Sequence, residues 1–61
     1  MTTQELVSVI TKSYPRTNIT YRLYDKNFEL FESLISYDDR AEVIYWHYYP
    51  NRKSIVIQIN Q

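Results

Sequence analysis

Residues 41–60 read AEVIYWHYYPNRKSIVIQIN and carry the strongest strand pattern in the chain. Residues 42–49 and 54–59 are rich in β-branched and aromatic side chains, which suit a pleated surface. Residues 50–53, PNRK, separate the two runs, since proline cannot donate to a strand ladder and asparagine tolerates the backbone of a tight turn. The pattern predicts a β-hairpin.

A turn with an even number of residues sets the register of this hairpin. Tyr49 then lies opposite Ser54, and successive residues pair outward from the turn. Because side chains alternate between the two faces of a strand, this pairing separates an apolar set from a mixed set. The apolar set, which we expect to form the core, is Ile44, Trp46, Tyr48, Ile55, Ile57 and Ile59. The mixed set is Val43, Tyr45, His47, Tyr49, Val56 and Gln58.

The N-terminal part predicts a helix followed by a strand. Thr2 and Glu5 have the spacing of a capping box, and residues 6–10 supply an apolar stripe. Pro15 disfavours helical backbone at the residue before it, so the helix should end shortly before the proline. Residues 17–24, TNITYRLY, alternate polar and apolar side chains and predict a strand.

Residues 27–37, NFELFESLISY, admit two interpretations. Wound as a helix with Asn27 as N-cap, they place their apolar side chains on one side. The predicted fold is then α+β, a single domain over residues 1–61 with the order α-β-α-β-β. Two helices cover one face of a three-stranded sheet that ends in the C-terminal hairpin. Read as strands, the same residues give one N-terminal helix on a four-stranded antiparallel meander. We favour the two-helix fold.

Composition excludes several classes of site. The chain has no Cys, no Gly and one His. Cysteine nucleophiles, multi-histidine metal sites within one chain and glycine-rich phosphate loops are therefore ruled out, and we expect no metal, no cofactor and no enzymatic activity. Positive φ angles should fall on Asn or Asp, which tolerate them best after Gly. The candidates are Asn18, Asn27, Asp38, Asp39 and Asn51.

Charge is balanced overall but not along the sequence. The formal net charge is zero, which gives no global field toward nucleic acid or an anionic membrane. Residues 25–42 carry six of the seven acids and two cations, whereas the flanks carry five cations and one acid. No apolar run reaches the length of a membrane span, and the N-terminal residues lack a signal-peptide pattern. We expect a cytoplasmic protein, in the host cytoplasm if it is viral.

The mixed side of the predicted sheet is the main candidate site. Together with alternate residues of the strand at 17–24, it gathers a cation, an imidazole and several tyrosines. This mixture suits protein interfaces, where Tyr and Arg act as anchors, and it also suits stacking of single-stranded nucleic acid. The candidate partner-binding residues are Arg22, Tyr24, Tyr45, His47, Tyr49 and Val56. An alternative, acidic surface for a basic partner is Glu29, Glu32, Asp38 and Asp39.

The expected function is that of a small non-enzymatic protein-binding module, which inhibits or adapts a partner by occupying its surface. Short regulatory reading frames, including those of phages and mobile elements, encode proteins of this kind. A chain this short buries only about 60% of its unfolded surface, so we also expect a homodimer or an obligate partner to stabilise it. Two alternatives stay open: a single-stranded nucleic-acid-binding protein that uses the Tyr- and Arg-bearing face, and a structural subunit of a larger complex.

The hairpin register leads to a first prediction. Ile57→Asp should unfold the domain, because an unpaired buried charge costs several kcal/mol, a large share of a total stability of roughly 5 kcal/mol. Val56→Asp, one residue away on the opposite face, should still fold. Thermal melts followed by circular dichroism compare the two variants, and the reverse order of stability would mean that the two faces are exchanged.

Overall fold

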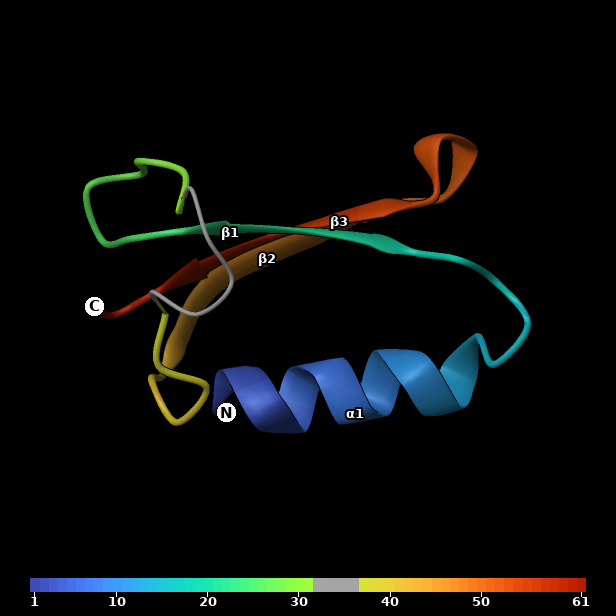
Figure 1. Cartoon of the computed structure of the whole chain (residues 1–61), viewed down its shortest axis with the longest axis horizontal. Helices are drawn as coiled ribbons and strands as arrows, with labels where there is room; N and C mark the ends of the chain where they lie inside the picture. The colour runs from blue at the N-terminus through green and yellow to red at the C-terminus, as the bar shows by residue number, and fades with distance from the viewer. Residues whose placement is uncertain (32–36) are drawn as a thin grey trace.

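The computed structural model of the chain describes residues 1–31 and 37–61. One helix and three strands make up the described fold, which confirms the α+β class. In chain order the elements are α1 (Thr3–Ser13), β1 (Thr20–Tyr24), β2 (Val43–Tyr49), the short 3-10 helix η1 (Pro50–Arg52) and β3 (Ser54–Ile59). α1 packs against one face of the sheet, and no helix of the described residues covers the other face (Figure 1).

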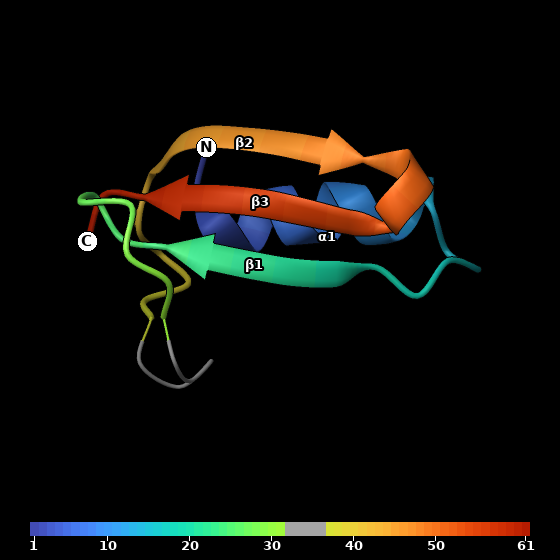
Figure 2. The same cartoon turned by 90° about the horizontal axis from the view of Figure 1, so that it is seen from above.

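The sheet is mixed, and its central strand is the last one in the sequence. The strand order is β1-β3-β2, with β1 parallel to β3 and β2 antiparallel to it (Figure 2). The pairs beside the turn are those predicted for an even loop: Tyr49 with Ser54, Tyr48 with Ile55 and Trp46 with Ile57. β1 and β2 therefore form the two edges of the sheet, and β3 holds them together.

A bulge at Ile44 shifts the register at the start of β2. Val43, rather than Ile44, lies opposite Ile59, and the ladder is irregular between Val43 and Tyr45. An extra residue in one strand breaks the alternation of side chains at that point. Val43 therefore packs against the core, whereas the Ile44 side chain is 53% exposed. The predicted positions of these two residues were wrong, because strict alternation holds only while the ladder is regular.

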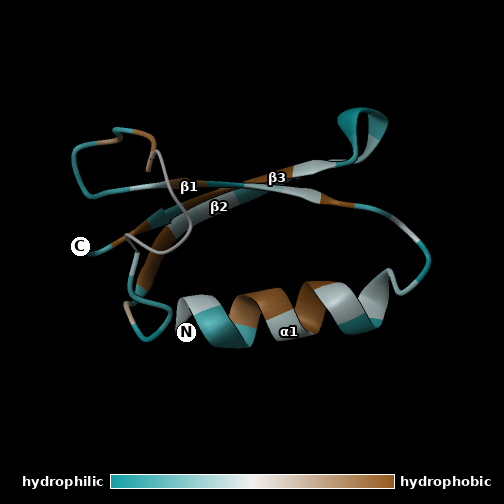
Figure 3. Cartoon of the chain, in the orientation of Figure 1, coloured by the Kyte–Doolittle hydropathy of each residue, from teal (hydrophilic) through white to brown (hydrophobic). Residues whose placement is uncertain are grey.

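β3 supplies the centre of the core. The buried apolar side chains are Leu6, Ile10, Leu23, Ile55, Ile57 and Ile59. They come from α1, β1 and β3, and hydrophobic residues recur along α1 (Figure 3). Full burial of each isoleucine contributes about 1.5–3 kcal/mol. Trp46 was predicted to join this core but is 45% exposed, because β2 is an edge strand that lies to one side of the buried cluster.

The helix predicted over residues 27–37 does not begin at Asn27. The Phe28 N–H donates to the Asp25 carbonyl at 2.9 Å, which closes a turn directly after β1. The helix prediction is therefore wrong up to residue 31, and residues 32–36 lie outside the described residues. Short apolar runs fit a helix by periodicity alone. A polar side chain that accepts hydrogen bonds from backbone N–H groups a few residues later instead favours a turn.

After this turn the chain returns along β1. Leu30 forms an isolated antiparallel bridge with Tyr24, and the Phe31 N–H donates to the Leu23 carbonyl at 2.9 Å. The alternative prediction, a four-stranded antiparallel meander, is wrong as well. Within residues 1–31 and 37–61 the sheet has three strands, and β1 runs parallel to β3.

The N-terminus of α1 is held by its own cap and by a distant loop. The predicted capping box is present: the Glu5 N–H donates to Thr2 Oγ1 at 3.2 Å, and the Thr2 N–H donates to Glu5 Oε1 at 3.0 Å. Thr3 is buried, and its N–H and Oγ1 both donate to the Ala41 carbonyl, at 3.0 and 3.1 Å. These last bonds tie the segment before β2 to the start of the helix.

The capping box leads to a second prediction. Thr2→Ala should lower the free energy of unfolding by about 1 kcal/mol, whereas Thr2→Ser should retain most of it. Hydrogen bonds from the Thr2 N–H and Oγ1 lower the pKa of the Glu5 carboxyl. A lowered folded-state pKa contributes stability above the unfolded-state pKa, and this is lost as the pH falls through the folded-state value. Glu5→Gln should therefore flatten the acid side of the stability profile measured by urea unfolding. An acid limb unchanged in this variant would contradict the assignment.

Candidate functional site

We term the face of the sheet turned away from α1 the open face. Its side chains form three rows across β1, β3 and β2. The rows are Thr20–Ser54–Tyr49, Arg22–Val56–His47 and Tyr24–Gln58–Tyr45. Alternation along the three strands places these residues opposite the buried Leu23, Ile55 and Ile57. The structure thus brings all six predicted partner-binding residues onto one face. They are Arg22, Tyr24, Tyr45, His47, Tyr49 and Val56.

A turn built around Asp25 projects above one end of the open face (Figure 1). Asp25 Oδ1 accepts from the N–H groups of Asn27 and Glu29 at 2.8 and 3.0 Å. The Gln58 side chain, in the last row of the face, donates from Nε2 to the Lys26 carbonyl at 3.2 Å. The turn is therefore fastened both within itself and to the central strand.

This turn presents the ring of Phe28 beside the open face. The ring centroid lies 4.9 Å from that of Tyr24 and 6.2 Å from that of Tyr45, yet the side chain stays 51% exposed. Its φ of 61° lies in the left-handed region, which costs a residue with a Cβ about 1–2 kcal/mol. An unfavourable backbone that holds an exposed ring is more typical of a binding site than of structural packing.

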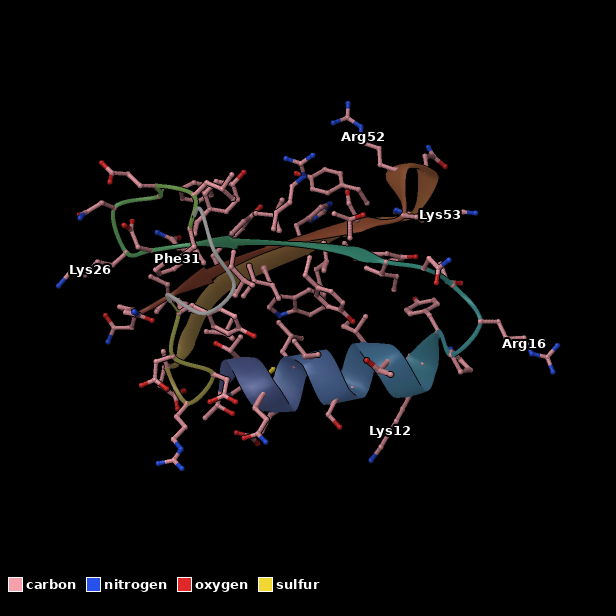
Figure 4. The ribbon with its side chains drawn as sticks, in the orientation of Figure 1. Lys12, Arg16, Lys26, Phe31, Arg52 and Lys53 are labelled. Carbon is pink, nitrogen blue, oxygen red and sulfur yellow. The ribbon has the colours of Figure 1, made fainter. Side chains whose placement is uncertain are left out.

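A groove of about 390 Å³ lies on the open face beside η1. Its lining residues are Thr20, Arg22, Tyr24, Tyr49, Arg52, Ser54 and Val56. Figure 4 shows Arg52 extending from η1 on the side of the sheet away from α1. Two guanidinium groups and four hydroxyl groups line the groove and no carboxylate does, so its chemistry suits a carboxylate or another anionic group.

The residues of the alternative acidic surface lie on two sides of the molecule. Glu29 belongs to the turn above the open face, whereas Asp38 and Asp39 lie in the loop beside the start of α1 (Figure 1). Asp38 has a local role, since its Oδ1 accepts from the Arg40 N–H at 2.9 Å. Glu32 lies outside the described residues.

The contact that the structure shows for His47 on the open face is with an aromatic ring. His47 lies edge-on to Tyr49 with ring centroids 4.6 Å apart, and no described acid hydrogen-bonds to its imidazole. A general base ordinarily needs such an orienting partner. In residues 1–31 and 37–61, no group of three acidic or histidine side chains is arranged to hold a metal ion. No helix of this part of the chain is long and apolar enough to cross a membrane.

Positive φ angles occur at Phe28 and Lys53 rather than at the predicted Asn and Asp positions. Asp25 takes the first position of its turn, where its carboxylate can accept backbone N–H groups, so the left-handed position falls three residues later. Lys53 follows η1 and turns the chain into β3 with φ of 49°.

The predicted set lacked several residues of the site, of which Phe28 and Arg52 matter most for its chemistry; the others are Thr20, Ser54 and Gln58. Asp25-Lys26-Asn27 directly after a strand is typical of a turn and would have placed Phe28 beside the sheet. Arg52 had no comparable signal, because only the parallel pairing of β1 with β3 brings Thr20 and Arg22 into the same groove.

Comparison with known proteins gives no match: no protein-family model, no curated protein and no solved structure matches this chain.

The backbone at Phe28 leads to a third prediction. Phe28→Asn should stay within about 1 kcal/mol of the wild-type free energy of unfolding. Relief of the left-handed backbone, about 1–2 kcal/mol, offsets lost ring contacts of about 0.5–1.5 kcal/mol. Phe28→Ala loses the ring without that relief and should be the less stable variant. Lys53→Asn, with the same kind of backbone outside the ring cluster, should raise stability. Urea unfolding measures the free energy of unfolding of all three variants. A Phe28→Ala variant as stable as Phe28→Asn would show that the left-handed backbone at Phe28 does not lower stability.

Proposed function

We propose that this chain is a non-enzymatic protein-binding module that acts through the open face. The observation that carries the proposal is the Phe28 ring, which the Asp25 turn holds half-exposed beside two tyrosines. Folding gains little from an exposed ring and loses backbone free energy to keep it there, so contact with another molecule explains the arrangement better.

The rest of the face supplies the composition that such a contact uses. Tyr45 and Tyr49 are exposed on β2, and Arg22 lies across β3 from them on β1, where it lines the groove together with Tyr49. Aromatic side chains give large contact areas for little loss of conformational entropy, and Arg adds directed hydrogen bonds. A module of this kind inhibits or adapts its partner by covering part of the partner's surface.

Single-stranded nucleic acid is the second candidate ligand. The groove, with Arg22 and Arg52 beside tyrosine rings, favours it, because phosphates and bases are held by such pairs. However, Asp25 and Glu29 lie in the turn at the other end of the same face, where a run of phosphates would meet like charge. We therefore place a protein partner first.

The fourth prediction tests which face makes contact. A photo-activated phenylalanine analogue at position 47, in the middle row of the open face, should yield a discrete protein adduct in cells that naturally contain the chain. The same analogue at Ser8, on the exposed side of α1, should not. Phe28→Asn combined with the probe at position 47 should reduce the adduct about tenfold, as loss of an anchor does.

The outcome of this experiment separates the candidates. Equal adducts from positions 47 and 8 would refute the open face as the interface. An adduct at position 47 that is removed by nuclease, together with gel shifts that weaken steeply with salt, would replace the protein partner by nucleic acid.

A further inference from the structure

We infer that the open face binds a second copy of the chain, turned end to end, so that η1 of each copy lies against the Asp25 turn of the other. This inference rests on the proposed function, because it names the partner of the same face. Two features carry it: the separation of charge along the molecule, and the uncovered aromatic side chains between the two charged ends.

The fold collects opposite charges at opposite ends of its long axis, which measures 29 Å. Arg16, Arg52 and Lys53 lie at the η1 end, and Lys26 lies at the other end (Figure 4). The described acids near that other end include Asp25, Glu29, Asp38 and Asp39, and one further cation, Arg40, lies in the loop with the last two. The uneven distribution of charge along the sequence therefore gives the folded molecule a basic end and a mainly acidic end, although its net charge is zero.

Besides Arg22 in the middle row of the open face, each projecting end of this side carries an exposed charge that could reach a second copy. η1 carries Arg52 and the Asp25 turn carries Glu29, and both segments project from the sheet away from α1 (Figure 1). Neither side chain forms an ion pair within the described residues, where the ion pair present joins the Met1 ammonium to Glu42 at 2.9 Å. The groove beside Arg52 has no acid in its own lining, so a carboxylate from outside would complete it.

Symmetry limits how two copies meet through one shared face, because the two-fold axis must lie within the interface. With the axis along the strands, η1 meets η1, and Arg52 faces the Arg52 of the second copy. With the axis across the strands, each η1 meets an Asp25 turn, and Arg52 faces Glu29 at two equivalent places. Like charges repel and opposite charges attract, so complementarity selects the end-to-end orientation.

The area of the face is also suited to a second copy. A stable interface needs about 800 Å² from each partner, which is about a sixth of the 4640 Å² surface of this chain. A molecule of 29 × 20 × 20 Å can supply that area only from a whole face. The open face has no helix over it, and Phe28, Tyr45 and Tyr49 are exposed there. A small domain gains stability from such pairing by mass action.

Sedimentation velocity at low salt, from low to high micromolar concentration, tests the arrangement. The wild type should change from monomer to dimer over this range. Arg52→Glu and Glu29→Arg should each weaken association by about tenfold or more, because each turns two attractive contacts into repulsive ones. The double variant, which exchanges the two charges, should recover wild-type association.

Each control variant has the same net charge as the test variant it is matched to, but its substitution lies outside the open face. Lys12→Glu changes net charge as Arg52→Glu does, and Gln4→Lys combined with Ser8→Lys changes it as Glu29→Arg does; these positions are exposed on α1, outside the open face. Both controls should associate like the wild type. Circular dichroism of all variants checks that each one folds.

Three results would overturn the inference. The first is a wild type that stays monomeric at high micromolar concentration, and the second is a double variant that associates no better than the single ones. The third is tighter association of Arg52→Glu with wild type than of wild type with itself, which would mean that like ends meet. A monomeric chain that still gives a protein adduct from position 47 would overturn the second-copy inference and leave the proposed function standing.

Discussion

The packing of β3 against α1 determines where every other part of the molecule lies. Ile55, Ile57 and Ile59 are fully buried on the central strand, and they face the apolar side of the helix. Because a strand turns alternate residues to opposite faces, burying these three sends Val56 and Gln58 to the open face. The ladders on both sides then align residues from β1 and β2 with them. The candidate site is in this sense the reverse side of the core.

A chain without glycine must place other residues where the backbone turns to positive φ. Among residues 1–31 and 37–61 these are Phe28 and Lys53, one at each end of the open face. At Lys53 the left-handed residue only reverses the chain after η1. At Phe28 the same conformation also sets an aromatic ring against Tyr24 and Tyr45. A glycine at that position would ease the turn but would supply no ring, so turn geometry and surface chemistry are joined in one residue.

The parts of this structure that follow from neighbouring residues could be predicted from the sequence. The capping box of Thr2 and Glu5 and the hairpin register beside η1 are of this kind, and alternation alone placed the six candidate residues on one face. The central position of β3 could not be predicted, since its parallel pairing with β1 leaves no local pattern. The residues around Ile44 do not indicate the bulge either. For residues 27–31 the apolar periodicity outweighed the turn signal at Asp25, and the helix prediction failed there.

The strand order also has a consequence for how the molecule is made. β3 lies between β1 and β2, so both edge strands require the segment that the ribosome delivers last among the three. Until Ser54–Ile59 emerge, α1 and β1 have no isoleucine surface to pack on. The β2–β3 pair closes over a short turn and forms quickly, whereas β1 must be captured across a long intervening segment. The sheet therefore assembles in one step once β3 is available, and before that step the apolar side of α1 lacks the isoleucine surface that covers it in the folded chain.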